Sequence, residues 1–226
     1  MSAVLRPAET VGGERVVVLH QITWDAYAAI GDALPDRRGL RMTFVDGRLT
    51  FLTLSRRHEW YAEHLGQLFQ AVALGCGIEL EVSGSAPYRQ KAKDVGVEGD
   101  KVYYLGDHAR TMRGPIDIDL ATQPPPDLAI EVEVSHPADD ALLVYGRLGV
   151  PEVWRLDVDE RTLRFCLRNE DGSYSDSPRS IGLPLLESAE VLDRLRLAES
   201  LGWREWVEQL IRWVSDEILP RANIDR

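Results

Sequence analysis

The chain has 226 residues, of which 44% are hydrophobic and 28% are charged. This length suits one globular domain, or one domain with an appendage, and allows a substantial buried core. The formal net charge of −11 argues against a protein that coats nucleic acid or anionic lipid through bulk charge. It leaves room for a local basic groove, or for a cation held by clustered carboxylates.

Cys76 and Cys166 lie far apart with no CxxC spacing, so the sequence predicts neither a zinc cage nor a disulfide framework. No stretch approaches the ~18 uninterrupted apolar residues of a membrane span. The first residues lack the basic and apolar regions of a secretory signal. We therefore expect a cytoplasmic protein that does not associate with a membrane.

Local signals define the first elements. Residues 1–14 are polar and predict a loose lead-in. Apolar residues at helical spacing, preceded by Thr23 as N-cap, predict a helix over 24–34.

A hairpin and a series of alternating elements follow. Asp46-Gly47 lies between two β-prone runs, 40–45 and 48–54, and predicts a hairpin because both positions of such a turn need positive φ. In chain order, periodicity and turn residues then predict a helix over 56–75, strands over 78–82, 88–91, 101–105 and 127–134, a helix over 138–149, strands over 153–157 and 162–167, and helices over 189–201 and 203–219.

This order of elements is typical of an α/β or α+β domain built on a central mixed sheet. We predict one domain over residues 15–185 and a helical tail over 186–226. The tail is expected to pack on the same domain, because Trp206, Leu210 and Trp213 share one face of its last helix.

The strand over 127–134 carries two acids on one side. Side chains alternate along a strand, so Glu131 and Glu133 point the same way, with Cα atoms about 6.6 Å apart. Such a face can simply meet water. In a central strand, however, each unpaired buried carboxylate would cost several kcal/mol, a cost that a hard divalent cation relieves. Asp100, just before the strand over 101–105, is a third acid that could share the ion.

Several enzyme signatures are absent. The sequence contains no GxxxxGK[ST] phosphate loop, no GxGxxG and no GxSxG elbow. His58-Glu59 resembles the beginning of a zinc-protease HExxH motif, but the next histidine is His64. This spacing corresponds to about 600° around a helix, so the two imidazoles do not align on a shared zinc ion.

A set of spaced motifs gives a more specific indication: the hairpin, the His58-Glu59 helix, Gly84-Ser85…Tyr88-Arg89, Asp100…Tyr103-Tyr104, Pro125-Pro126-Asp127-Leu-Ala-Ile-Glu131, and Tyr145…Leu148-Gly-Val-Pro-Glu-Val-Trp154. Together they resemble the bacterial putative restriction endonuclease family of the PD-(D/E)XK nuclease superfamily. The resemblance covers roughly residues 23–185, and the last two helices fit the C-terminal tail of that family. It implies a restriction-endonuclease-like fold, with a central mixed sheet flanked by helices and an N-terminal antiparallel hairpin.

By that resemblance, Asp100 is the motif aspartate and Glu131 the glutamate of (D/E)xK. Both would bind Mg²⁺ or Mn²⁺, with the carbonyl of Val132 as a further ligand. His58 and Glu59 match positions near the mouth of the active site. The family implies an enzyme, a metal-dependent DNA endonuclease that hydrolyses phosphodiester bonds with a metal-activated water.

The expected active-site lysine is missing from both of its usual places. Glu133 stands at the lysine position of (D/E)xK, and Ala141 stands where relatives recruit a lysine or arginine from the following helix. That cation helps to polarise the attacking water and to offset developing negative charge. The remaining candidates for this role are Arg89, Lys91, Lys93 and Lys101, of which Lys101 should point to the opposite face of the sheet.

The departure leaves several interpretations open. Glu133 could complete a second metal position in an active site, since two-metal sites hold ions about 3.5–4 Å apart. The protein could instead be a catalytically degenerate nuclease-fold module that binds DNA or a protein partner without cleavage. A purely structural protein with solvated acids is the third interpretation.

Basic residues gather locally despite the negative net charge: Arg37, Arg38, Arg41, Arg48, Arg56 and Arg57 stand against only Asp36 and Asp46 in that stretch. Arg56 and Arg57 occupy the first turn of a helix, where cations oppose the helix dipole unless an anion binds there. We expect both, with Arg89 and Lys91, to bind the DNA substrate along one wall of a groove. The same pattern also fits an ordinary solvated surface. Sheet edges and the Trp-rich last helix could support a homodimer.

Overall fold

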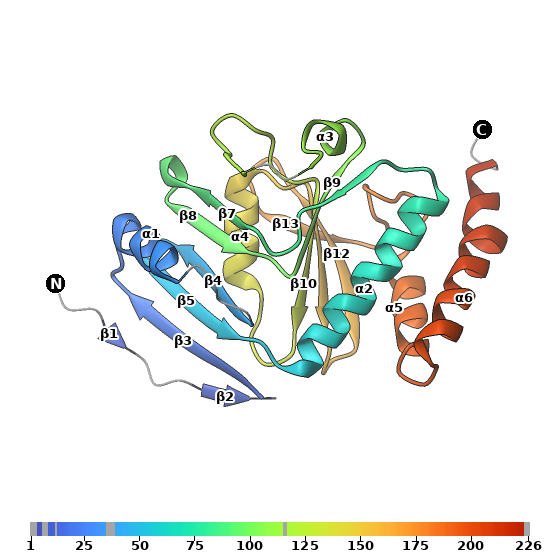
Figure 1. The fold of residues 1–226 in the computed structure, drawn as a ribbon, viewed down its shortest axis with the longest axis horizontal. Coiled ribbons are helices and arrows are strands. Elements are labelled where there is room, and N and C mark those ends of the chain that lie inside the picture. The colour runs from blue at the N-terminus through green and yellow to red at the C-terminus, as the bar shows by residue number, and fades with distance from the viewer. Residues whose placement is uncertain (1–3, 6–8, 12, 35–38, 115–116, 224–226) are drawn as a thin grey trace.

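The computed structural model describes residues 4–5, 9–11, 13–34, 39–114 and 117–223. Helices and two β-sheets alternate in layers across the molecule (Figure 1). One helix covers an antiparallel sheet, a second helix lies between that sheet and a mixed sheet, and three helices cover the far side of the mixed sheet. In that order the helices are α1 (Trp24–Ala33), α4 (Asp139–Leu148), and the group α2 (Arg56–Gly75), α5 (Ser188–Leu197) and α6 (Trp203–Trp213).

The first sheet is antiparallel throughout and has the strand order β1-β3-β5-β4-β8-β7, with β2 paired to β3. Its strands are β1 (Val4–Leu5), β2 (Glu9–Val11), β3 (Glu14–His20), β4 (Leu40–Val45), β5 (Arg48–Thr53), β7 (Pro87–Gln90) and β8 (Val95–Glu98). Asp46 and Gly47 have φ values of 51° and 72°, so the predicted hairpin between β4 and β5 is confirmed. Alternation then directs Met42 and Phe44 into the core beneath α1, and Thr43 toward α4.

The second sheet is mixed and has the order β13-β12-β11-β10-β9-β6, in which β10 and β11 are parallel. Its strands are β6 (Leu80–Val82), β9 (Lys101–Leu105), β10 (Leu128–Glu133), β11 (Glu152–Asp157), β12 (Thr162–Arg168) and β13 (Tyr174–Ser177). Along β10, Leu128, Ile130 and Val132 belong to the core beneath α2, whereas Ala129 belongs to the core beneath α4. Every residue of β10 is buried, as expected for a strand covered by helices on both faces.

Helix capping agrees with the sequence. Thr23 Oγ1 accepts a hydrogen bond from the Ala26 backbone N–H at 3.2 Å, and Ser55 Oγ accepts one from the His58 N–H at 3.1 Å. Both residues are therefore the N-caps that were predicted. Shorter helical segments are η1 (Lys91–Lys93), α3 (Gly106–Thr111), η2 (Val214–Ile218) and η3 (Leu219–Asn223).

The predicted mixed α/β class is confirmed: the second sheet is the mixed sheet flanked by helices, and the predicted antiparallel hairpin belongs to a separate first sheet. The lead-in predicted over residues 1–14 is wrong where the structure describes it, because β1, β2 and the start of β3 lie there. The predicted strands over 78–82 and 88–91 do not pair: β6 joins the second sheet and β7 the first. Strand pairing depends on partners distant in sequence, which local propensity does not specify.

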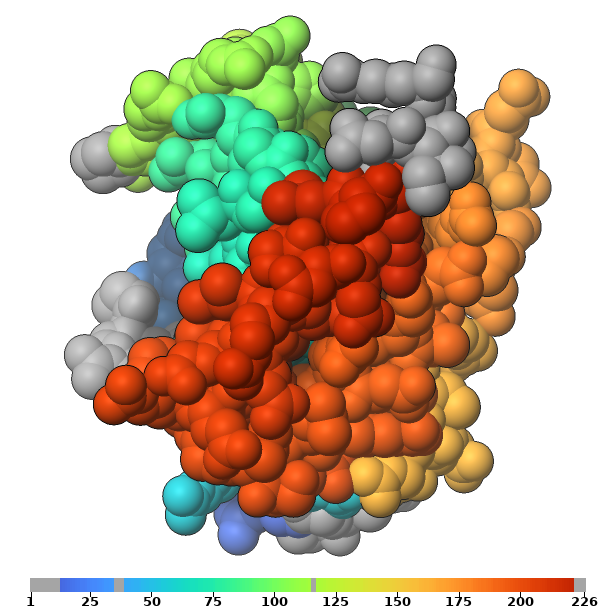
Figure 2. All heavy atoms as spheres, turned by 90° about the vertical axis from the view of Figure 1, so that its right-hand side faces the viewer, coloured from blue at the N-terminus to red at the C-terminus, as the bar shows by residue number. Residues whose placement is uncertain are grey.

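The last two helices, α5 and α6, form much of the face shown in Figure 2. α5 packs on β12 and on α2, and α6 packs on α2. Trp206, Leu210 and Trp213 are buried in the same core as β10, and Trp206 Nε1 donates a hydrogen bond to the Arg194 carbonyl at 2.9 Å. The apolar face predicted for the last helix therefore contacts the domain. Among the described helices, none has the length and hydropathy needed to span a membrane.

Candidate active site

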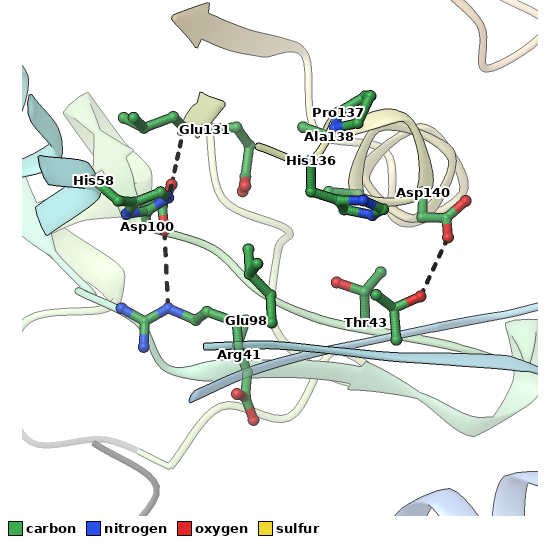
Figure 3. A pocket seen from close by; sticks show the side chains of 14 residues that line it. Arg41, Thr43, His58, Glu98, Asp100, Glu131, His136, Pro137, Ala138 and Asp140 are labelled. Carbon is green, nitrogen blue, oxygen red and sulfur yellow. Dashed lines mark hydrogen bonds and ion pairs between the residues drawn. The ribbon is translucent and has the colours of Figure 1, made fainter. Parts of the chain in front are cut away.

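A small cavity lies between the two sheets, at the N-terminal end of α4 (Figure 3). Its volume is about 40 Å³, which is enough for an ion with a few waters. Its polar and charged lining comprises Arg41, Thr43, Thr50, His58, Glu98, Asp100, Glu131, His136 and Asp140. Three of the five residues predicted as catalytic, Asp100, Glu131 and His58, therefore meet in one place.

Asp100 contacts three groups in and around the cavity. It directly precedes β9 and is 7% exposed. Its Oδ2 accepts a hydrogen bond from the Val132 backbone N–H at 2.8 Å and lies 3.1 Å from His58 Nε2. Its Oδ1 lies 3.9 Å from Arg41 Nε. The bond to Val132 fixes Asp100 to the strand that carries Glu131, so the two acids share one side of the cavity.

Glu131 is buried beside Asp100. Its Oε1 accepts a hydrogen bond from the Tyr145 hydroxyl of α4 at 2.6 Å. Burial and the charge of Asp100 raise the pKa of Glu131 to about 8, although the Tyr145 hydrogen bond acts in the opposite direction. Gly99 makes this arrangement possible, because a Cβ there would lie 2.2 Å from the Tyr145 hydroxyl.

His58 enters the cavity from the first turn of α2, where the Ser55 cap holds its backbone. Burial alone would lower the pKa of His58, but the charge of Asp100 and the hydrogen bond to it prevail and raise that pKa to about 9. The imidazole is therefore protonated at neutral pH. Glu14 of β3 contributes to this effect; it is 1% exposed and accepts a hydrogen bond from Ser135 Oγ at 2.5 Å.

Sequence reasoning missed Glu14 and Glu98 as neighbours of this site. Glu14 falls at the end of the expected lead-in, but the Val-rich run that follows it is a strand signal. Glu98 accepts a hydrogen bond from the Met42 backbone N–H at 3.2 Å, which joins the cavity wall to β4. No local pattern marks Glu98, because its partner lies 56 positions away in the chain.

A second group of charges closes the cavity at the α4 side. Asp140 forms an ion pair with Arg48 and a 3.5 Å hydrogen bond with Thr50 Oγ1. Figure 3 shows Asp140 and His136 at one end of the cavity and His58 with Asp100 at the other. The cavity is thus bounded by the β4–β5 hairpin on one side and by α4 and β10 on the other.

Glu133, at the lysine position of the motif, faces the same side of β10 as Glu131 but lies outside the cavity lining. Its Oε1 accepts a hydrogen bond from Arg155 Nε at 2.5 Å, and Arg155 Nη2 donates another to Asp139 at 3.0 Å. The charge of Glu133 is therefore compensated by Arg155. Ala141, the other expected lysine position, lines the cavity.

The four basic residues predicted to bind substrate do not line this cavity. Arg56 is exposed in the first turn of α2. The other three form ion pairs: Arg57 with Asp159 at 2.7 Å, Lys91 with Asp25 at 3.0 Å, and Arg89 with Asp32 at 3.2 Å.

Two further candidates, Glu59 and Lys101, also lie outside the cavity lining. Glu59 is exposed on α2. Lys101 Nζ contacts Glu63 at 2.5 Å on the α2 side of the second sheet, the face opposite the acids. Arg37 and Arg38 lie outside the described residues.

The donor set fits a hard divalent cation with a mostly aqueous shell. Among the described residues, no group of three or more His, Cys, Asp or Glu side chains is arranged to hold a metal ion by itself. Mg²⁺, however, typically binds through one or two carboxylates and keeps several waters. Asp100 and Glu131 provide such a pair. Burial and the repulsion from Asp100 raise the pKa of Glu131, and a bound cation relieves that repulsion.

We expect the metal-free protein to lose stability as the pH rises from about 5 to about 9. Glu131 has an ordinary pKa of 4.5 and His58 one of 6.5, and folding raises both, to about 8 and about 9. Each group binds its proton more tightly when folded, so its stabilising contribution is complete below the ordinary pKa and is lost as the pH passes the raised one. Urea unfolding in EDTA, at steps across this range, measures the slope.

The matched variant for this measurement is Glu131→Gln, which should flatten the profile because it removes one titrating group and part of the field on His58. A wild-type stability that rises between pH 5 and pH 9, or an unchanged slope in the variant, would contradict the expected coupling.

Comparison with known proteins identifies the family. Residues 24–200 match Uma2, described as a putative restriction endonuclease family. The chain belongs to this family. The predicted relationship to that family is thereby confirmed.

Among solved structures, a putative nuclease belonging to DUF820 from Anabaena variabilis is similar to this chain. The sequence identity is 14% and the TM-score 0.49, and the match covers 85% of this chain and 99% of the other. No curated protein matches the chain.

Proposed function

We propose that this Uma2 family member is a DNA endonuclease that hydrolyses phosphodiester bonds and depends on Mg²⁺ or Mn²⁺. The observation that carries the proposal is the convergence in one cavity of Asp100, which directly precedes β9, and Glu131 of the neighbouring strand β10. Burial and the charge of Asp100 both disfavour the ionised form of Glu131, so an arrangement that keeps the two acids adjacent favours a role that needs both of them.

Each side chain of the cavity has a distinct part in this proposal. Asp100 and Glu131 would hold the ion with the oxygens that face the cavity, and the Val132 carbonyl is a candidate third ligand. When bound, the metal supplies Lewis acidity toward the phosphate and toward a water molecule. Protonated His58 fixes the orientation of Asp100, and the Tyr145 hydroxyl fixes that of Glu131.

A nicking assay on supercoiled plasmid tests the proposal. We expect the wild-type protein to convert supercoiled DNA to open-circular DNA with Mg²⁺ or Mn²⁺, and to stop when EDTA removes the metal. Absence of nicking with either metal, over a range of pH and protein concentration, would contradict catalysis.

A second candidate function has its own support. Because Glu133 is paired with Arg155 and residue 141 is alanine, the protein could be a degenerate module that binds DNA or a protein partner without cleavage. The Ala141→Lys variant separates the two functions. If the wild type is inactive and this variant nicks DNA, the wild type has lost catalysis and is the degenerate module. If the wild type nicks DNA and the substitution does not change its rate, the active site works without a lysine at these positions.

A further inference from the structure

The cavity contains an arginine with a buried donor that has no hydrogen-bond partner among the described residues. Arg41 lies on β4, and alternation along that strand directs it, like Thr43, toward the second sheet. Its side chain is 16% exposed. Its Nε is buried and makes no hydrogen bond to any described residue, although buried donors normally have partners.

Asp100 does not satisfy this arginine. The 3.9 Å separation between Arg41 Nε and Asp100 Oδ1 is an ion-pair distance, too long for a hydrogen bond. The guanidinium is nevertheless close enough to Glu131 for its charge to lower the pKa of that acid, against the larger effect of burial. Arg41 is therefore next to both acids with donor capacity unused.

The other cations near the acids each lie within ion-pair distance of a carboxylate, although Arg48 Nε and His58 Nδ1 are also buried without a hydrogen bond to a described residue. His58 Nε2 is 3.1 Å from Asp100, Arg155 is bonded to Glu133 and Asp139, and Arg48 is paired with Asp140. A guanidinium presents several N–H donors in a planar fork that matches phosphate oxygens. Of the basic side chains that line the cavity, only Arg41 combines a permanent charge with an unfilled donor.

We propose that Arg41 is the cation that binds the phosphate of the DNA strand at this site, in place of the lysine missing from positions 133 and 141. The inference rests on the proposed function, since it requires a phosphodiester to enter the cavity beside Asp100 and Glu131. The positive charge would then come from β4 of the first sheet, and not from β10 or α4, where positions 133 and 141 lie.

Three measurements on the full chain test the assignment: plasmid nicking with Mn²⁺, binding of a fluorescent DNA duplex in EDTA, and calorimetric titration with Mn²⁺ alone. For Arg41→Gln, we expect nicking to fall about 100-fold and metal-free DNA binding to weaken. Mn²⁺ binding should not weaken, because the substitution removes a positive charge beside the acids.

The double variant Arg41→Gln,Ala141→Lys should recover part of the nicking. Arg164→Gln is the matched control, a strand arginine outside the cavity whose Nε is also unbonded.

The outcomes separate this inference from the proposed function. If wild type and Arg41→Gln nick and bind DNA equally, Arg41 does not bind phosphate, and the proposed function stands. If both nicking and Mn²⁺ binding are lost in Arg41→Gln, the arginine is structural and the inference fails. If the wild type binds DNA without nicking it, weaker binding by Arg41→Gln still supports the inference, and equal binding overturns it. A wild type that neither binds nor nicks DNA overturns both proposals.

If Arg41→Gln does not fold, Arg41→Lys is compared with the wild type instead. We expect reduced DNA binding and nicking in that variant, because lysine lacks the planar fork of donors.

Discussion

Nicking by the Glu131→Gln variant is expected to fall roughly 1,000-fold below wild type, because a lost metal ligand removes several kcal/mol of transition-state stabilisation at ~1.4 kcal/mol for each factor of ten. Glutamine has nearly the same shape as glutamate and keeps an oxygen that accepts from the Tyr145 hydroxyl. The substitution therefore removes charge with little change in packing. Initial rates of plasmid nicking with Mn²⁺ measure the effect.

The same variant separates catalysis from folding. Because Glu131 is buried beside Asp100, removal of its charge should leave the metal-free protein at least as stable as wild type at pH 8. Glu152→Gln is the matched control: Glu152 is also buried, but its oxygens accept hydrogen bonds from Trp154 Nε1 and the backbone of residues 181 and 182. Burial raises the pKa of Glu152 despite these hydrogen bonds, as it does at Glu131. We expect the control to retain nicking in the folded fraction. Nicking by Glu131→Gln within a few-fold of wild type would refute the metal-site assignment.

The free energy of unfolding should fall by about 4 kcal/mol in the Trp154→Ala variant. Trp154 is fully buried in β11, its ring stacks on Phe165 with centroids 4.4 Å apart, and it meets Phe69 of α2 edge-on at 5.3 Å. Alanine would leave a cavity between the second sheet and α2. It would also remove the indole N–H that Glu152 accepts at 2.7 Å, leaving a buried carboxylate less satisfied.

Urea titration followed by far-UV circular dichroism measures this change. Trp203→Ala is the control, since Trp203 is 61% exposed at the start of α6 and its indole N–H donates a hydrogen bond to Gln67. We expect that control to change the unfolding free energy by less than ~1 kcal/mol. A loss of similar size in both variants would mean that Trp154 does not anchor the sheet to α2.

The features that sequence predicted correctly depend on local signals. The Asp46-Gly47 turn and the Ser55 cap need only neighbouring residues, and both occur as expected. Alternation along β10 correctly placed Glu131 and Glu133 on one side of the strand. The two acids nevertheless have different partners. Arg155 lies opposite Glu131 in the register of β10 with β11, but its side chain donates a hydrogen bond to Glu133.

The features that sequence did not predict depend on contacts between distant segments. The division of the strands into two sheets follows from pairings such as Thr43 with Val97, which no local pattern specifies. The cavity exists only because those two sheets face each other. Arg41 was one of several clustered arginines in the sequence, and its position beside Asp100 depends on that same arrangement. The roles predicted for His58, Asp100 and Glu131 stay predictions until they are measured.

The route of the chain through the cavity determines what its parts can do separately. A cut in the turn at Gly77, between α2 and β6, would leave Arg41 and His58 on one piece and Asp100 and Glu131 on the other. The pairing of β4 with β8 would also be split, which exposes a strand edge on each piece. Neither piece alone would hold the opposing charges together, so the site requires both halves of the chain.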